Sequence, residues 1–120
     1  MSIKQFRPMT PGTRFRSADD MIVSAGYNIA PPEVEGALLL HPKVADCAVI
    51  GIADAQRGQL VKAFVVLRPG VAPEPGLVGE LQDFVKQAIA PYKYPREIEF
   101  RSELPRTENG KLQRFRLRPT

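Results

Sequence analysis

Two β-branched and nearly continuous apolar stretches occupy the middle of this chain of 120 residues. The first, KVADCAVIGIAD, begins at residue 43, and the second, GQLVKAFVVLRPG, begins at residue 58, after a short polar loop. Such runs are typical of central strands, and Lys62 is expected to point outward from the second one. Strands of this kind need apolar cover, so the two stretches predict a sheet packed against other elements.

Two helices are predicted to supply that cover. The stretch PPEVEGALLLH, residues 31–41, has prolines at its first positions and acids in its first turn, and Pro42 ends it. Residues 77–89 carry apolar side chains at helical spacing, which makes them the clearest amphipathic helix of the sequence.

Shorter elements flank this centre. The stretch DDMIVSAGYNI predicts two short strands that turn at Gly26, REIEFRS predicts a half-buried strand, and a short final helix is expected around Leu112 and Phe115. The expected fold class is α+β, with a short two-stranded hairpin and a three-stranded sheet that has two helices packed on one face. Residues 1–18 are expected to be an extended or disordered lead, and residues 19–120 to form the domain.

The charge of the chain is distributed unevenly. Residues 1–16 carry four basic groups and no acid, residues 106–120 carry five basic groups and one acid, and the part between them has a net charge of −4. Basic ends attract the phosphates of a nucleotide, a phosphopantetheine carrier or a nucleic acid. Nucleic acid is the weakest of these options, because few aromatic residues are interleaved with the basic ones.

Several classes of site are missing from the sequence. It has no glycine-rich phosphate loop and no Cys/His cluster with metal-ligand spacing, so no metal site is expected. Cys47 lies in an apolar run and is expected to be a buried, inert thiol, whereas His41 is expected to take a capping or surface role. We expect no membrane span and, because the first residues lack an apolar stretch, a cytoplasmic protein.

A turn near the C-terminus presents a lysine. In PRTENGKLQR, residues 105–114, turn-forming residues lead to Asn109-Gly110, and Lys111 follows directly. Asn-Gly favours positive φ, which predicts a tight turn. A mobile ammonium group at such a turn suits contact with an anion, although a solvated loop lysine is the simpler interpretation of this residue taken alone.

Three stretches of the chain resemble one protein family. They are DDMIVSAGYNIAPPEVEGALLLHPKVADCAVIGIADAQRGQLVKAFVVLRPG, IAPYKYPREIEF and LPRTENGKLQR, which occur in the order and spacing of the C-terminal domain of adenylate-forming acyl-CoA synthetases. The resemblance covers residues 19–117 and is strongest to benzoate- and 2-aminobenzoate-CoA ligases. It implies that the chain is the small lid domain of a ligase, whose large N-terminal domain binds ATP, Mg²⁺ and the carboxylic acid.

The resemblance also implies roles for individual residues. Lys111 matches the lysine that contacts carboxylate and phosphate oxygens while the acyl-adenylate forms, which is electrostatic catalysis. Asp19 matches the hinge about which the lid then turns. The loop that enters the active site for attack by coenzyme A matches Ser24, Ala25, Gly26 and Tyr27. Positions that can meet the CoA nucleotide match Lys93, Tyr94 and Arg96.

Structural interpretations of the same residues stay open. Gly26 suits any hairpin turn, Asp19 suits a cap, and PYKYPR suits a rigid connector bounded by prolines. The lid domain is not expected to bind a cofactor or turn over by itself, because the printed sequence holds no ATP-binding part. The alternative is a free-standing, non-catalytic module that binds CoA, a carrier protein or a ligase partner, and nucleic-acid binding ranks last.

Overall fold

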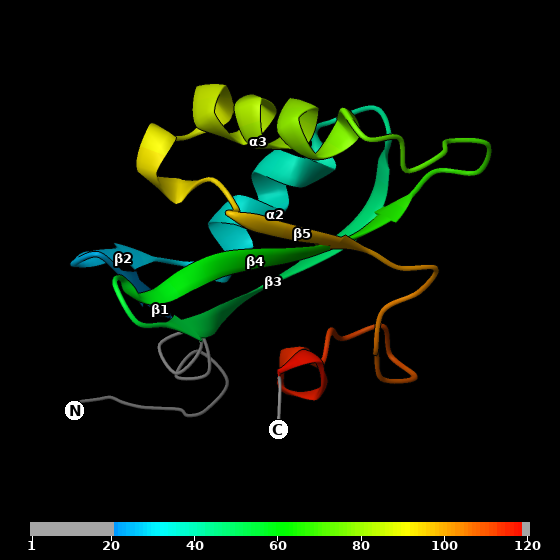
Figure 1. The fold of residues 1–120 in the computed structure, drawn as a ribbon. Helices are drawn as coiled ribbons and strands as arrows, with labels where there is room; N and C mark the ends of the chain where they lie inside the picture. Colours follow the sequence, from blue (N-terminus) through cyan, green and yellow to red (C-terminus); the bar gives the residue numbers. More distant parts are fainter. Residues whose placement is uncertain (1–20, 119–120) are drawn as a thin grey trace, which may run out of the picture.

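The computed structural model describes residues 21–118, so Asp19 and the expected lead lie outside the described residues. Within that range the predicted strands and helices occur in the predicted order (Figure 1). They are β1 (Ile22–Ser24), β2 (Tyr27–Ile29), α2 (Pro31–Leu39), β3 (Val44–Asp54), β4 (Gly58–Leu67), α3 (Leu77–Ala88), the 3-10 helix η1 (Pro91–Lys93), β5 (Glu97–Phe100) and the 3-10 helix η2 (Arg114–Leu117). The expected α+β class is confirmed.

The larger sheet has the order β3-β4-β5, and β1 pairs with β2 in a separate hairpin. β3 and β4 are antiparallel, with Val49 opposite Ala63, whereas β5 runs parallel to β4, with Ile98 opposite Ala63. The parallel pair is joined through α3, because parallel neighbours need a crossover connection. In the order β3-β4-β5, β3 is an edge strand, and among residues 21–118 its outer edge has no neighbouring strand.

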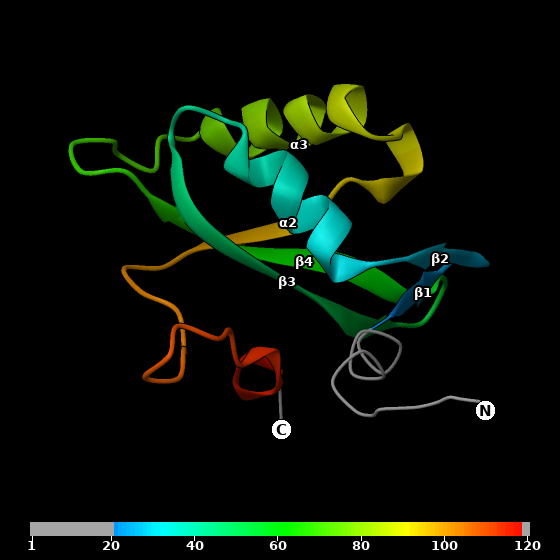
Figure 2. The ribbon, with the colours of Figure 1, turned by 180° about the vertical axis from the view of Figure 1, so that it is seen from behind.

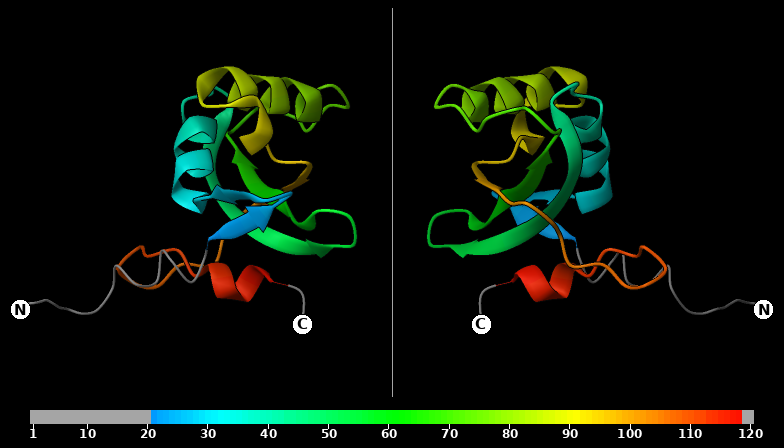
Figure 3. Two further views of the ribbon diagram at one scale, coloured as in Figure 1. Left: turned by 90° about the vertical axis from the view of Figure 1, so that its left-hand side faces the viewer. Right: turned by 90° about the vertical axis from the view of Figure 1, so that its right-hand side faces the viewer.

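Both α-helices cover the same face of the three-stranded sheet, as predicted (Figures 1 and 3). Their apolar sides and the sheet residues beneath them form the main core. Its fully buried members include Val34, Leu38, Val49, Val61, Val65, Leu81 and Val85.

The opposite face of the sheet is covered by the C-terminal segment, which the sequence analysis did not predict. Leu117 of η2 is buried there, against Ala48, Ile50 and Phe64. The short final helix expected around Leu112 and Phe115 is η2, which includes Phe115 but begins after Leu112, and Phe115 is 68% exposed. A 3-10 helix has three residues per turn, so the buried side that includes position 117 cannot also include position 115.

His41 is buried, so the surface role, one of the two roles expected for it, is wrong. Its Nδ1 accepts the backbone N–H of Lys43 at 3.1 Å, and its Nε2 lies 2.8 Å from Glu80 Oε2. The proton of the neutral ring must therefore be on Nε2, which donates it to Glu80. Burial alone would raise the pKa of Glu80, but the hydrogen bonds from His41 and Lys43 outweigh it and lower that pKa. This contact ties the end of α2 to α3.

The β1–β2 hairpin is docked against the larger sheet, at one end of β3 and β4 (Figure 2). Ile22 of β1 is fully buried and lies over Gly51 of β3, where an added Cβ would approach the isoleucine side chain to 3.1 Å. The backbone N–H of Val23 donates to Gln59 Oε1 at 2.8 Å. The missing side chain at Gly51 thus makes room for the hairpin.

Candidate functional site

Lys111 lies on a small hairpin that projects from the C-terminal segment. Arg106 and Leu112 form an antiparallel bridge, and Gly110, with φ of 87°, closes the turn by donating to the Thr107 carbonyl at 2.9 Å. The Thr107 hydroxyl accepts the backbone N–H of Lys111 at 3.0 Å. The tight turn expected at Asn109-Gly110 is present. We name residues 106–112 the lysine hairpin.

The side chain of Lys111 is exposed. Among the residues that the structure describes, its ammonium group has no hydrogen-bond or ion-pair partner, although its backbone is held on both sides of the turn. Because the ammonium group has no such partner, binding an external anion breaks no contact of this group within residues 21–118. The lysine hairpin therefore exposes a cation on a backbone that is held in place.

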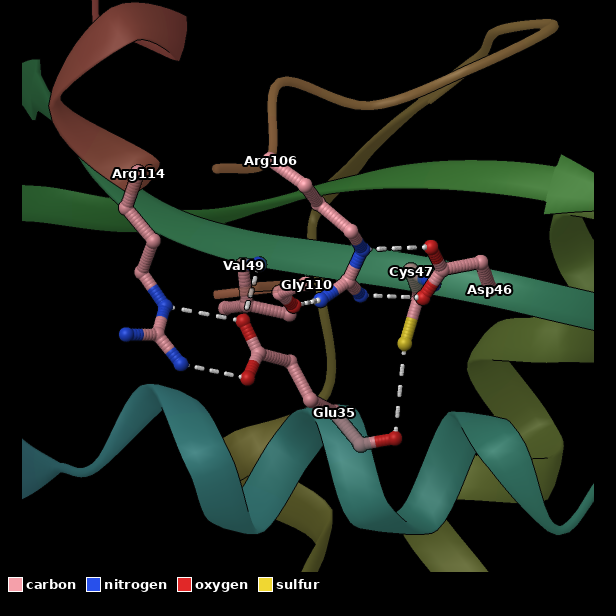
Figure 4. Close-up of polar contacts among 7 residues, drawn as sticks. All are labelled: Glu35, Asp46, Cys47, Val49, Arg106, Gly110 and Arg114. Carbon is pink, nitrogen blue, oxygen red and sulfur yellow. Dashed lines mark hydrogen bonds and ion pairs between the residues drawn. The ribbon is translucent and has the colours of Figure 1, made fainter. Parts of the chain in front are cut away.

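An arginine joins the lysine hairpin to β3. The Nε and Nη2 atoms of Arg106 donate to the two carboxylate oxygens of Asp46, at 3.1 and 2.7 Å (Figure 4). Its Nη1 donates to the carbonyl of Gly110 at 2.7 Å. One planar guanidinium group thus fixes the residue before Lys111 against the sheet.

A second arginine joins the segment after Lys111 to α2. Arg114 donates from Nε and Nη2 to the two carboxylate oxygens of Glu35, at 2.9 and 2.5 Å (Figure 4). Glu35 is buried, and its Oε2 also accepts the backbone N–H of Val49 at 2.8 Å. Glu35 therefore satisfies an N–H group on the unpaired edge of β3 and an arginine at the same time.

Cys47 lies behind these two ion pairs and is a buried, free thiol, as expected. Its Sγ donates to the backbone carbonyl of Glu35 at 3.4 Å. Burial, with a further contribution from the negative charges of Glu35 and Asp46, raises the pKa of Cys47 to about 12. The thiol therefore stays protonated, which excludes the thiolate chemistry that a nucleophilic cysteine needs.

The β1–β2 turn places Ala25 and Gly26 at its tip, both with positive φ, of 51° and 85°. Such a pair of dihedrals forms the turn that matches the twist of a two-residue hairpin. No atom lies within 4 Å of a Cβ added at Gly26, so the tip faces open space. The buried Ser24 hydroxyl accepts from Arg57 Nε at 3.1 Å, and the Arg57 carbonyl accepts from the Ala25 N–H.

Tyr27, next to this tip, stacks on an aromatic ring of η1. The ring centroids of Tyr27 and Tyr92 are 4.2 Å apart, and both side chains are exposed. Lys93 follows Tyr92 and donates to Glu33 Oε1 at 2.7 Å, a hydrogen bond that raises the pKa of Lys93. The stack therefore joins the tip of the β1–β2 hairpin to the first of the three proposed nucleotide contacts.

Tyr94 and Arg96 form the continuation of this surface. Arg96 Nη1 donates to the Tyr94 hydroxyl at 2.8 Å, and its guanidinium lies 4.7 Å from the centre of that ring. The ammonium group of Lys86, on α3, lies 4.4 Å from the centre of the same ring. We name this set the aromatic–cation surface, and it consists of Tyr27, Lys86, Tyr92, Lys93, Tyr94 and Arg96.

The structure divides the predicted site residues into two groups. The β1–β2 turn and η1 lie at one end of the sheet, whereas the lysine hairpin lies toward the other end, on the side of η2 (Figures 1, 2 and 3). The tyrosine stack brings the turn and the nucleotide contacts together. Lys111 is not part of that group, so the domain presents two separate surfaces.

Sequence reasoning missed the residues that hold Lys111 in place. They are Glu35, Asp46, Arg106 and Arg114. Two signals were available, because Asp46 interrupts an apolar strand and the two arginines flank the lysine. Neither signal identifies the partners, since each ion pair joins residues 60 or 79 positions apart.

The described part of the chain gives no sign of a metal site or a membrane segment. Within residues 21–118, no three His, Cys, Asp or Glu side chains gather where they could hold a metal ion. No helix in the same range has the length and apolar character that crossing a membrane requires.

Comparison with known proteins identifies the class of domain. The family model of the AMP-binding enzyme C-terminal domain matches residues 33–111, about two thirds of the chain. The chain belongs to this family. The resemblance to this family is therefore confirmed over residues 33–111, a range that includes the lysine hairpin up to Lys111.

Particular relatives are acyl-CoA synthetases and ligases. Acyl-coenzyme A synthetase ACSM1, mitochondrial, from Homo sapiens is 52% identical over 103 residues, which are 84% of this chain and 18% of the human protein. The crystal structure of a Brucella canis acyl-CoA synthetase has a TM-score of 0.81 and 52% identity, over 84% of this chain and 19% of that one. The anthranilate CoA ligase AuaEII in complex with anthranoyl-AMP has a TM-score of 0.77 and 45% identity, over 83% and 19%.

The chain spans less than a fifth of the length of each of these relatives. In them the matched domain is one part of a longer polypeptide. Any activity of this chain that depends on the rest of such a ligase is therefore a matter of proposal.

Proposed function

We propose that this chain is the lid of an ATP-dependent acyl-CoA ligase and that it presents two different surfaces to one active site. The observation that carries the proposal is Lys111, an exposed ammonium without an internal partner among residues 21–118, on a hairpin held by Arg106 and Arg114. Membership of the family supports the same conclusion. The active site itself belongs to an AMP-binding domain, supplied in the same polypeptide or by a separate one.

In the first half-reaction Lys111 supplies positive charge. When a carboxylate attacks the α-phosphate of ATP, negative charge is shared between carboxylate and phosphate oxygens and the leaving pyrophosphate. An ammonium group that is already in place stabilises this charge without reorganisation during the step. Mg²⁺ is proposed to accompany ATP on the AMP-binding domain.

In the second half-reaction the β1–β2 turn replaces the lysine hairpin. The tip at Ala25-Gly26 offers backbone without a side chain at Gly26, which leaves room for a pantetheine arm to pass. The thiol of CoA then attacks the acyl carbon, and AMP leaves. The aromatic–cation surface lies beside the turn, where Tyr27 and Tyr92 offer ring faces and Lys93 and Arg96 offer charges to the CoA nucleotide.

Rotation between the two arrangements is proposed to occur at Asp19, two positions before the first described residue. A hinge residue must absorb a large change in φ and ψ, and Asp tolerates unusual dihedral angles better than most residues. The separation of the two surfaces on the domain supports a rotation rather than a small shift (Figure 1).

The acid is selected by the AMP-binding domain in this proposal. The 45% identity to an anthranilate CoA ligase over this domain therefore does not indicate which acid is activated. Comparison of benzoate, anthranilate and a straight-chain fatty acid as substrates of chimaeras that share this lid domain tests this point, and a preferred acid that follows the lid domain would contradict it.

The test of the lysine uses a chimaera in which the 120-residue chain replaces the C-terminal domain of the anthranilate CoA ligase. Formation of anthranoyl-AMP from ATP and anthranilate is measured by pyrophosphate release, and formation of anthranoyl-CoA is measured from preformed anthranoyl-AMP. Lys111→Ala is expected to slow the first reaction about 10²–10³-fold and to leave the second unchanged. The matched control is Arg68→Ala, which removes another exposed cation, on the loop after β4.

The turn is tested in the same chimaera. Gly26→Leu is expected to slow anthranoyl-CoA formation and to leave anthranoyl-AMP formation unchanged. Gly70→Leu is the control, because Gly70 has the same positive φ of 86° and equally open surroundings. A chimaera that binds CoA but shows neither half-reaction would favour the non-catalytic module over the lid.

A further inference from the structure

The lysine hairpin is attached to the domain at two points along one strand edge. Asp46 and Val49 lie on β3, whose outer edge has no neighbouring strand. The carboxylate of Asp46 accepts the Cys47 N–H, and the carboxylate of Glu35 accepts the Val49 N–H, so both carboxylates lie at this edge (Figure 4). Each of them receives one arginine of the C-terminal segment.

The contact at Arg106 acts on the backbone next to Lys111. Two of its nitrogen atoms bind Asp46, and the third binds the Gly110 carbonyl at 2.7 Å. A guanidinium group is planar and rigid, so the two hydrogen bonds from Nε and Nη2 to Asp46 also fix the direction in which Nη1 points. The position of the peptide that leads into Lys111 is therefore set by β3.

The contact at Arg114 acts on the other side. Arg114 begins η2, three residues after Lys111, and its bidentate pair with the buried Glu35 fixes the start of that helix. Lys111 thus lies between two braced points, five residues after Arg106 and three residues before Arg114. Its main chain is restrained from both directions while its side chain remains exposed.

The Arg106–Asp46 pair is poorly explained as a stabilising contact alone. Its side chains are 36% and 31% exposed, and ion pairs at such exposure contribute little to stability. A third hydrogen bond that ends on Gly110, rather than on another part of the body, indicates a role at the turn itself.

We propose that Arg106, oriented by Asp46, is a positioning residue for adenylate formation and that it sets the place from which Lys111 reaches its anion. This inference rests on the proposed function of Lys111. The Glu35–Arg114 pair is the second, more buried brace. The thioester step does not depend on Arg106, because the β1–β2 turn that serves that step is held by other contacts.

The test uses the chimaera with the anthranilate ligase and its two half-reactions. Arg106→Ala is expected to lower the rate constant for anthranoyl-AMP formation about 10–100-fold, because displacement of a catalytic group by about 1 Å has effects of that size. The rate of anthranoyl-CoA formation from preformed anthranoyl-AMP and the thermal unfolding midpoint are expected to stay at wild-type values. Arg106→Lys is expected to restore only part of the loss, because a lysine cannot bind Asp46 and Gly110 with fixed geometry.

A double-mutant cycle with Lys111 separates positioning from general damage. In the Lys111→Ala background, Arg106→Ala is expected to cause no further loss of anthranoyl-AMP formation, since the group that it positions is absent. Arg101→Ala is the matched control, because it breaks the exposed Arg101–Glu99 pair at 2.8 Å and the contact of its guanidinium with the Phe64 ring, neither of which includes a residue of the lysine hairpin. It is expected to change neither half-reaction.

The outcomes distinguish the two hypotheses. Equal losses in both half-reactions, or a further loss from Arg106→Ala in the Lys111→Ala background, would overturn the positioning role. A normal rate for Arg106→Ala beside a slow Lys111→Ala would overturn it as well, while the proposed function stands. A normal rate of anthranoyl-AMP formation for Lys111→Ala would remove the proposed function and this inference together.

Discussion

The two hairpins that carry the proposed site residues are attached to the domain by different forces. The β1–β2 hairpin inserts Ile22 and Ile29 into the main core, and both side chains are fully buried. The lysine hairpin packs one partly buried side chain, Leu112, against the smaller apolar cluster and is otherwise held by Arg106 and Arg114, through bidentate ion pairs. Apolar burial is strong but lacks direction, whereas a guanidinium–carboxylate pair is weaker in net terms and sets an orientation.

This difference corresponds to what each hairpin is proposed to present. A backbone turn that lines a passage needs a stable base and tolerates small shifts, so an apolar anchor suffices. An ammonium group that must meet developing charge needs a defined direction of approach. The comparison therefore predicts that substitutions at the base of the β1–β2 hairpin reduce stability, whereas those at Arg106 and Lys111 reduce activity at nearly constant stability.

The largest loss of stability is expected for Ile29→Ala, at about 3 kcal/mol. Removing three carbons from a fully buried position loses transfer free energy and leaves a cavity. Urea unfolding followed by circular dichroism measures the change. Val23, in the other strand of the same hairpin, is 48% exposed. Val23→Ala is therefore expected to change stability by less than about 0.5 kcal/mol. Similar values for the two variants would contradict the apolar anchor.

Glu35→Ala is expected to cost about 2 kcal/mol. It leaves the Val49 N–H without an acceptor and Arg114 without its carboxylate partner, and unpaired buried donors carry a cost of this order. Glu97→Ala, which removes an exposed carboxylate 4.0 Å from Lys62, is the control and should be close to wild type. The same urea titration compares them.

The buried thiol of Cys47 is expected to make the free energy of unfolding decrease at alkaline pH. The pKa of Cys47 is raised from 9.0 to about 12 on folding, so the stabilisation is complete below pH 9 and is lost as the pH rises from 9 toward 12. At pH 10 the loss amounts to about 1 kcal/mol, because the unfolded thiol ionises and the folded one does not. The difference between wild type and Cys47→Ala, measured from pH 8 to pH 11, isolates this contribution from that of other groups. A difference that does not change with pH would contradict it.

The smallest effect is expected at the lysine itself. Lys111→Ala removes an exposed side chain without an internal partner among residues 21–118, and stability should change by less than about 0.5 kcal/mol. Thermal unfolding of the isolated chain measures this. A clear loss of stability would mean that the ammonium has an internal role, and the contrast between the two hairpins would disappear.

The sequence predicted the elements of this fold well because each has a local signature. The apolar runs at 43–54 and 58–67, the prolines at 31 and 32, and the helical spacing from residue 77 depend on neighbouring residues only. The order of strands in the sheet depends on residues far apart in the sequence, and the parallel pairing of β5 with β4 was not predicted. The burial of His41 was missed for a similar reason, since its partner Glu80 lies 39 residues away.

The residues of the candidate site also fall into those with a local signal in the sequence and those without one. Gly26 and Lys111 were identified because a turn signal marks each position, and the structure places both at exposed turns. Arg106 and Arg114 resembled ordinary basic residues of a basic end, because their carboxylate partners are far away in sequence. Long-range charge pairs leave little trace in a single sequence, so the support of the lysine was visible only in the structure.

The edge of β3 has a consequence beyond the placement of Lys111. A strand with open N–H and carbonyl groups is a template on which another chain can add a strand, which leads to association or aggregation. Here the carboxylates of Glu35 and Asp46 occupy N–H groups of that edge, and the C-terminal segment is pinned over it by two arginines. The segment that carries the lysine therefore also shields the sheet, and a chain shortened before residue 106 should associate more readily with other chains as well as lose its cation.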